Sequence, residues 1–102
     1  MDEKFWRFLG MACRAGRLVF GSEGVERGMR SGEVVLAILS EDAGPNTQDR
    51  ISRLSAHYGI PLITAGDRQT IGHWTGRDVR VTVGVVDEGF ARRLMELAGM
   101  QE

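Results

Sequence analysis

The stretch of sequence best suited to chemistry is a glycine-bracketed turn followed by basic residues, Gly21-Ser-Glu-Gly24 with Arg27 and Arg30. Its bare Gly-x-x-Gly form is one that some RNA-binding domains use to hold a nucleotide backbone, although that pattern alone carries little information. Ser22 is a good N-cap, so the turn would begin a helix. Because free backbone N–H groups at the start of a helix can meet phosphate or base edges, the turn is a candidate ligand site.

Patterns for catalysis or metal binding are sparse. His57 and His73 lie at no metal-ligand spacing with each other or with Cys13, which argues against a zinc site. Glu41-Asp42 could be a magnesium-binding pair of the phosphoreceiver kind or simply a solvated turn, but a receiver domain starts with a strand and this chain starts with a helix. No nucleophile is paired with a base, and no Walker loop or nucleophile elbow occurs. We expect no enzymatic activity and no cofactor.

The net charge and its distribution along the chain do not identify the binding partner. The net charge of −1 argues against a protein that coats nucleic acid indiscriminately. The stretch from Lys4 to Gly32 nevertheless holds six basic residues and two acidic ones, whereas Glu33 to Asp49 holds four acidic residues and no basic one. Such an asymmetry either carries a local anion site that the total conceals or is solvated surface.

The length of 102 residues and a hydrophobic content of 42% fit one domain, residues 1–102, with a single core. No segment approaches the roughly 18 apolar residues of a membrane span, and the amino end lacks the apolar stretch of a signal peptide. A single cysteine, Cys13, cannot form an internal disulfide, which is consistent with a reducing compartment. We expect a cytoplasmic monomer.

Hydrophobic patterning predicts alternating strands and helices. Val34–Leu39 is an unbroken apolar run that ends in a polar turn, as in a central strand buried on both faces. Such a sheet needs helices on both faces, so we expect an α/β protein, a three-layer α/β/α sandwich. The other expected strands are Leu18–Phe20, Ile60–Thr64 and Val79–Val85. The first is either a very short strand or an apolar plug. In the last, apolar and other residues alternate, which predicts one drier face. The expected helices are one that ends at Ala15-Gly16, one from Ser22 to the stop at Gly32, one from Asn46 to Gly59, a short one capped by Asp67 and running through Trp74, and one from about Glu88.

The helix that follows the glycine turn has an expected buried stripe of Val25 and Met29, with Glu26 facing outward beside the two arginines. Gly24 and Gly28 within it cost about 1 kcal/mol each relative to alanine. A helix with that cost often needs close approach by another backbone or a ligand.

The next helix has its own expected cap and stripe. Asn46 with Asp49 resembles a capping pair at its start. Ile51, Leu54 and Tyr58 form its expected buried stripe.

Taken in order, a set of short motifs resembles the kink-turn-binding ribosomal proteins of the L7Ae and L30e type, in their short bacterial branch. The set spans nearly the whole chain, from about Lys4 to Leu97, and its specificity lies in order and spacing. The resemblance implies an α/β/α sandwich around a small mixed central sheet, with RNA bound at one end. The matching segments are Gly21–Arg27, Arg30–Gly32, Val35–Asp42, Pro45–Thr47, Ile60-Pro61, Ile71-Gly72, Thr75-Gly76 and Val83–Asp87.

The resemblance also assigns the glycine turn. The family's RNA-contacting motif typically reads Gly-Thr-Asn-Glu-x-x-Lys, and its positions fall on Gly21, Ser22, Glu23, Gly24 and Arg27. Arg27 in place of lysine offers a stiffer fork to a phosphate or a guanine edge. The family's Asn and Glu, which read sheared G·A pairs, are replaced by Glu23 and Gly24. Because Glu23 cannot donate hydrogen bonds as an amide does, recognition of a standard kink-turn would be weakened, altered or lost.

A second family contact is a loop before the last strand that cups an extruded base. It falls on Arg77, Asp78, Val79 and Arg80. Family members usually have an apolar residue at the place of Arg77, whereas Val79 remains apolar. Arg68, which opens the short helix, matches a basic family position.

The leading hypothesis is therefore a non-enzymatic protein that binds structured, kink-turn-like RNA, ribosomal or translation-linked. The Gly21–Gly24 backbone would approach the RNA closely, and Val79 would pack on an unstacked base. This requires the two loops to converge into one positively charged pocket at the tip of the sandwich. The expected phosphate contacts are Arg17, Arg27, Arg30, Arg68, Arg77 and Arg80.

The competing hypothesis is a protein-interaction module on the same scaffold, as in relatives from eukaryotic stress signalling. Glu41-Asp42, Asp49 and an exposed Trp6 or Trp74 would then form a docking face. The altered residues of the glycine turn favour this alternative. The retained residues of that turn oppose it, as do the arginines of the loop at residues 77–80, here called the later loop.

Overall fold

The computed structural model describes residues 1–100 and has a four-stranded sheet at its centre, in the order β1-β4-β2-β3. β4 is antiparallel to both of its neighbours, whereas β2 and β3 are parallel. The small mixed sheet implied by the resemblance is thus confirmed, and the short apolar segment before the glycine turn is a strand. The strands are β1 (Leu18–Phe20), β2 (Leu36–Leu39), β3 (Leu62–Thr64) and β4 (Thr82–Val85).

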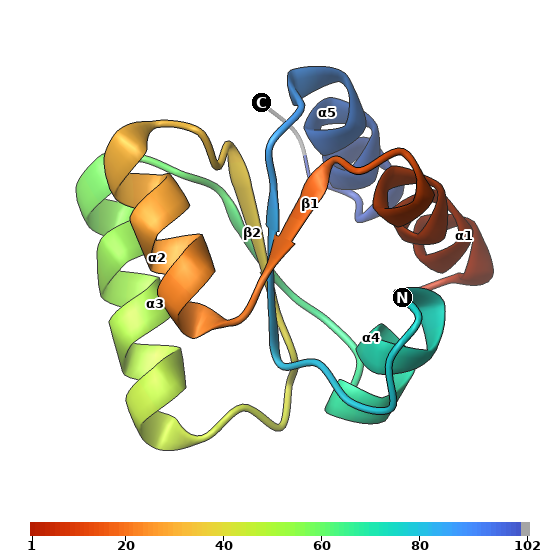
Figure 1. Ribbon diagram of the computed structural model, residues 1–102, viewed down its shortest axis with the longest axis horizontal. Coiled ribbons are helices and arrows are strands. Elements are labelled where there is room, and N and C mark those ends of the chain that lie inside the picture. Colours follow the sequence, from red (N-terminus) through yellow and green to blue (C-terminus); the bar gives the residue numbers. More distant parts are fainter. Residues whose placement is uncertain (101–102) are drawn as a thin grey trace.

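Helices cover both faces of this sheet (Figure 1). The layer on one face consists of α2 (Ser22–Ser31) and α3 (Pro45–Tyr58), and the layer on the other consists of α1 (Glu3–Arg14), α4 (Arg68–Trp74) and α5 (Glu88–Leu97). Apolar side chains fill the space on each side of the sheet in two clusters. The three-layer α/β/α sandwich is confirmed. Within residues 1–100, no helix is both long and apolar enough to cross a membrane.

The two inner strands are buried on both faces. All four residues of β2 are buried, as its apolar run predicts. β4 is equally buried because it lies between β1 and β2 with helices on each side. The expected drier face of a strand from Val79 was therefore wrong, since the strand begins at Thr82 and both Thr82 and Gly84 are inside. A Cβ atom at Gly84 would come within 2.9 Å of methyl groups of Val19 and Val34, so only glycine fits there without a shift.

Two helices begin differently from the sequence expectation. Gly21, not Ser22, occupies the N-cap position of α2, and no side chain caps that end. α3 begins at Pro45, with Gly44 as its N-cap, so the expected capping role of Asn46 was wrong. Proline is favoured at the first helical position because it has no N–H group to leave unpaired there.

Glu26, which was expected to face outward, is buried between α2 and α3. Its Oε1 accepts a hydrogen bond from Arg50 Nε at 2.8 Å and lies 3.8 Å from Arg30 Nη2. A buried carboxylate is tolerated when cations and donors satisfy it in this way. The periodicity of α2 could not reveal this arrangement because Arg50 comes from α3. Tyr58 also departs from expectation, because it is exposed at the end of α3.

This arrangement predicts unequal effects of two glutamates on one helix. Replacing Glu26 with Gln should lower the free energy of unfolding by about 1 to 2 kcal/mol, because it removes a charged acceptor from two arginines. The matched change Glu23→Gln should stay within about 0.5 kcal/mol, since the Glu23 side chain is 93% exposed and that of Glu26 only 8%. Urea denaturation of both variants measures the difference. Equal losses would contradict the buried role of Glu26.

Candidate nucleic-acid interface

The glycine turn and the loop before β4 meet at one end of the sandwich, the lower end in Figure 1. The N–H of Gly21 donates to the carbonyl of Thr82 at 3.1 Å, and the hydroxyl oxygens of Ser22 and Thr82 lie 3.2 Å apart. The guanidinium carbon of Arg80 sits 3.4 Å from the ring centre of Phe20. The expected proximity of the two loops is therefore confirmed.

The turn itself presents backbone to solvent. Gly21 has φ +83°, a left-handed conformation that a residue with a side chain rarely adopts, and it redirects the chain from β1 into α2. The first N–H groups of α2 point out of this end without intrahelical partners, where the helix dipole adds partial positive charge. A Cβ atom at Gly24 would meet no heavy atom within 4 Å. Protein packing therefore does not explain this glycine, whereas Gly28 has Val34 directly against it.

Glu23 and Arg27 lie on the exposed side of the first turns of α2. The Arg27 side chain is 75% exposed and makes one long ion pair, 3.7 Å, with Glu23. Exposed pairs of this kind contribute little, about 0.3 to 0.5 kcal/mol, so Arg27 can exchange Glu23 for another anion.

Two of the expected phosphate contacts lie away from this end. The carbonyl of Arg17 accepts from Val86 N at 3.0 Å, beyond the far ends of β1 and β4. Arg30 belongs to the last turn of α2, about 13 Å along the helix from Gly21, and pairs with Glu26. Neither arginine therefore lies with the two loops. The sequence could not reveal this, because the order of elements does not show which end of a strand or helix faces the loops.

The later loop is held against α4 by a close backbone contact. A Cβ atom at Gly72 would come within 2.7 Å of the carbonyl oxygen of Asp78, and Arg77 N donates to the carbonyl of Gly72 at 2.8 Å. This packing leaves Val79 52% exposed. Val79 therefore offers a small apolar surface beside charged neighbours.

Arg80 is a cation of the site that lies on an aromatic ring. Its guanidinium lies over Phe20, which itself packs on the core cluster beneath α1 and α5. Desolvation lowers the pKa of Arg80, and the nearby positive charge of Arg77 lowers it further. An arginine stays charged despite such shifts, so this is a cation in an unfavourable electrostatic position.

Arg27 and Arg80 approach the Gly21 turn from different sides of the sheet. Arg27 belongs to α2 on one face, whereas Arg80 stacks on a phenylalanine that packs toward the other face. The single positively charged pocket that the RNA-binding hypothesis required was therefore wrong. The two loops do meet at the Gly21 turn, and their cations form a surface that wraps around it.

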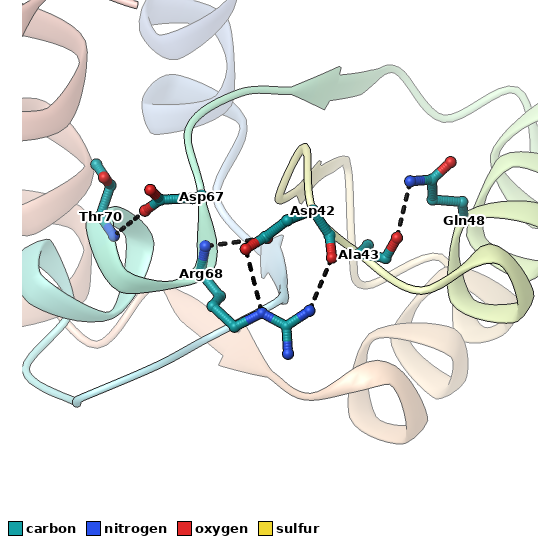
Figure 2. A network of polar contacts seen from close by, with 6 residues as sticks. All are labelled: Asp42, Ala43, Gln48, Asp67, Arg68 and Thr70. Carbon is teal, nitrogen blue, oxygen red and sulfur yellow. Dashed lines mark hydrogen bonds and ion pairs between the residues drawn. The ribbon is translucent and has the colours of Figure 1, made fainter.

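Figure 2 shows how Arg68 is held. Its backbone N and its Nε donate to the two carboxylate oxygens of Asp42, and its Nη2 donates to the Asp42 carbonyl at 2.7 Å. Neighbouring atoms partly desolvate the Asp42 carboxylate, which raises its pKa, but hydrogen bonds and the charge of Arg68 outweigh this and leave the pKa below its usual value. Arg68 thus ties the end of β2 to the start of α4, and it remains partly exposed.

Asp67 caps α4 as predicted. Its side chain accepts from Thr70 N at 2.7 Å, and that backbone hydrogen bond lowers the pKa of the carboxyl group (Figure 2). Glu41-Asp42 has no partners for a metal site, since residues 1–100 contain no group of three or more His, Cys, Asp or Glu side chains that could hold an ion.

The docking face of the competing hypothesis does not form as expected. Trp6 is only 6% exposed and stacks edge-on against Phe5, so the expectation of an exposed Trp6 was wrong. Trp74 is half-buried. Asp42 and Asp49 are both occupied by arginines, Asp49 by Arg53 at 2.6 Å.

Comparison with known proteins identifies a family and relatives of similar length. The model of the ribosomal protein L7Ae/L30e/S12e/Gadd45 family matches residues 4–95. A protein of Bacillus subtilis (strain 168) named RNA-binding protein YlxQ is 33% identical over 94 residues, which cover 92% of this chain and 94% of that protein.

Solved structures show the same fold. A protein of unknown function from Bacillus halodurans C superposes with a TM-score of 0.94 at 39% identity, covering 96% of this chain and 99% of that one. The Giardia lamblia 15.5kD RNA binding protein superposes with a TM-score of 0.81 at 14% identity, covering 97% and 88% of the two chains. The low identity of the second structure limits that likeness to the fold.

Two helical glycines of the site should respond oppositely to alanine. Gly24→Ala should raise the free energy of unfolding by about 0.5 to 1 kcal/mol, because the added methyl group meets open space and alanine favours helix. Gly72→Ala should lower it by about 1 to 3 kcal/mol, because backbone atoms of Asp78 and Val79 would have to move. Denaturant unfolding measures both. A stabilising Gly72→Ala would contradict the described packing of the later loop.

Proposed function

Because the chain belongs to the ribosomal protein L7Ae/L30e/S12e/Gadd45 family, we propose that it is a non-enzymatic RNA-binding protein that recognises structured, kink-turn-like RNA. The proposed target is a cytoplasmic RNA, ribosomal or otherwise linked to translation, and the protein acts as a monomer. The Bacillus subtilis relative carries the name of an RNA-binding protein, which supports this assignment.

The observation that supports this function best is that the uncapped start of α2 lies near Arg80, which has no carboxylate partner among the described residues. At Gly21 the chain exposes the first N–H groups of α2, and Arg80 lies beside the turn on Phe20. Helix starts and arginine forks both favour phosphate oxygens. A bent RNA whose backbone follows this end of the sandwich would meet both groups.

Each residue of the surface has a proposed role. The backbone of Gly21, Ser22, Glu23 and Gly24 approaches the RNA closely, and Arg27 contacts a phosphate or a guanine edge. The exposed side chain of Val79 packs on an unstacked base. The remaining proposed contacts come from the later loop and its neighbour, Arg77, Asp78, Arg80 and Arg68.

Arg30 has a different place in the proposal. Because it lies at the far end of α2, it reaches only an RNA that continues along that helix. The same holds more strongly for Arg17, which lies at the opposite end of the sheet.

Recognition in this chain rests on shape and backbone more than on base edges. Glu23 and Gly24 stand where the family pattern has Asn and Glu, so two base-reading side chains are missing. Gly24 instead leaves open space beside the start of the helix. We expect discrimination of bent from straight RNA, with weak dependence on the identity of the G·A pairs.

This preference can be measured by titrating the protein with a kink-turn RNA and with a straight duplex of equal length, over a range of salt concentrations. Tighter binding to the bent RNA and a linear fall of log affinity with log salt are expected. Equal affinity for both RNAs, or affinity without a salt slope, would remove the specific proposal. A partner protein captured through the same surface, without RNA, would support the interaction module instead.

Replacing Arg27 with Ala should weaken binding of the kink-turn RNA by about 1 to 3 kcal/mol if Arg27 contacts a base. If it contacts a phosphate, the loss of affinity should be smaller and the salt slope should fall by about 1. Arg93→Ala is the matched control, because Arg93 is also an exposed helical arginine paired with a glutamate but lies on α5 in the opposite layer. Equal losses for the two variants would show that only total charge matters.

A further inference from the structure

Arg80 differs from most arginines of the protein in its lack of a carboxylate partner. Seven others lie within 4.0 Å of an acid, whereas Arg80 has no such ion pair within the described residues. Its Nε is buried and has no hydrogen-bond partner in residues 1–100. Among residues 1–100, desolvation lowers the pKa of Arg80 and the nearby cation Arg77 lowers it further. A partly desolvated cation without an anion is unfavourable for the folded protein.

Phe20 holds this cation in place. The guanidinium carbon lies 3.4 Å from the ring centre, a close cation–π contact that covers one face of the guanidinium group. The ring is fixed in turn, because Phe20 pairs with Val83 in the sheet and packs on the core cluster. The backbone of Arg80 is anchored as well, since its N–H donates to the carbonyl of Arg68 at 3.0 Å. Both ends of the side chain are therefore positioned before any ligand arrives.

We propose that Phe20, Arg77 and Arg80 form a clamp for one backbone phosphate of the bound RNA, with Phe20 as a positioning residue that aims the edge of the Arg80 guanidinium at the phosphate. The clamp deepens the proposed RNA-binding function and rests on it. Phe20 directly precedes Gly21, so the clamp and the start of α2 meet at the glycine turn from the two faces of the sheet.

A phosphate fits this place better than a base does. Two adjacent arginines repel each other, and an anion between or beside them removes that repulsion, whereas a neutral base does not. An arginine fork matches two phosphate oxygens at once, and stacking on a ring leaves the edge of the fork available for this.

The test measures affinity for kink-turn RNA over a range of salt concentrations for the full chain and for variants of the clamp. Arg80→Gln should weaken binding about 5- to 100-fold and reduce the salt slope by about 1. Phe20→Leu keeps the charge and should weaken binding about two- to tenfold, whereas Phe20→Tyr keeps the ring and should bind within about twofold of the parent protein. Arg92→Gln, an exposed arginine on α5, is the control for lost charge.

The decisive readout is the double variant. If Phe20 acts through Arg80, Phe20→Leu combined with Arg80→Gln should bind no more weakly than Arg80→Gln alone, to within about twofold. Additive losses would assign Phe20 a merely structural role and overturn its positioning role. Thermal unfolding of each variant shows whether it is folded. If Phe20→Leu does not fold, Phe20→Tyr and Arg77→Gln still test the clamp.

Failure of the clamp and failure of the proposed function give different results. If the parent protein binds kink-turn RNA and Arg80→Gln binds equally well, the clamp is wrong and the RNA-binding proposal stands. If Arg80→Gln weakens binding without changing the salt slope, the contact is to a base and the phosphate assignment is overturned. If the parent protein binds no structured RNA, the proposed function fails and the clamp fails with it.

Discussion

The position of the whole site depends on the pairing of β4 with strands on both of its sides. Its register sets Phe20 opposite Val83 and Leu39 opposite Thr82. Just beyond these pairs, Gly21 N donates to the Thr82 carbonyl and Ser40 N donates to the Val81 carbonyl. One strand therefore fixes where β1 turns into α2, where β2 ends, and where the loop before β4 arrives. A shift of this register would separate the glycine turn from Arg80.

Close packing around small residues protects this register. Gly84 lets Val19 and Val34 meet across β4, and Gly72 lets the backbone at Asp78 rest on α4. In the layer of α2 and α3, Glu26 accepts a hydrogen bond from Arg50 and so joins the two helices. These contacts hold the elements that carry the loops, while the loop tips keep exposed groups such as Val79 and the Arg27 side chain. The residues that hold the elements in place are thus different from the residues that are exposed to a ligand.

The sequence was most informative about elements whose patterns are local. The apolar run of β2, the capping role of Asp67 and the glycine stop after α2 depend on neighbouring residues, and the structure confirms all three. The patterning also predicted three layers because strands and helices alternate. Predictions went wrong where the deciding partner lies far along the chain. Glu26 is buried because of Arg50 on another helix, and β4 has no drier face because of its central place in the sheet.

The same division applies to the candidate site. The order of motifs pointed to the glycine turn and the later loop, but no local signal indicated that Phe20 carries Arg80 or that Asp42 holds Arg68. Those pairs join residues brought together by sheet register and by the turn into α4. Sequence order alone also could not separate Arg17 and Arg30 from the arginines near Gly21.

We propose that the two loops act as one RNA-binding surface around Gly21. The most direct measurement is a backbone amide NMR titration of the isotopically labelled protein with kink-turn RNA. We expect the amide signals of residues 22–24 and of residues 77–80 to shift together at the same RNA concentrations, and those of α5 not to shift. Changes confined to one loop, or centred on α5, would contradict it.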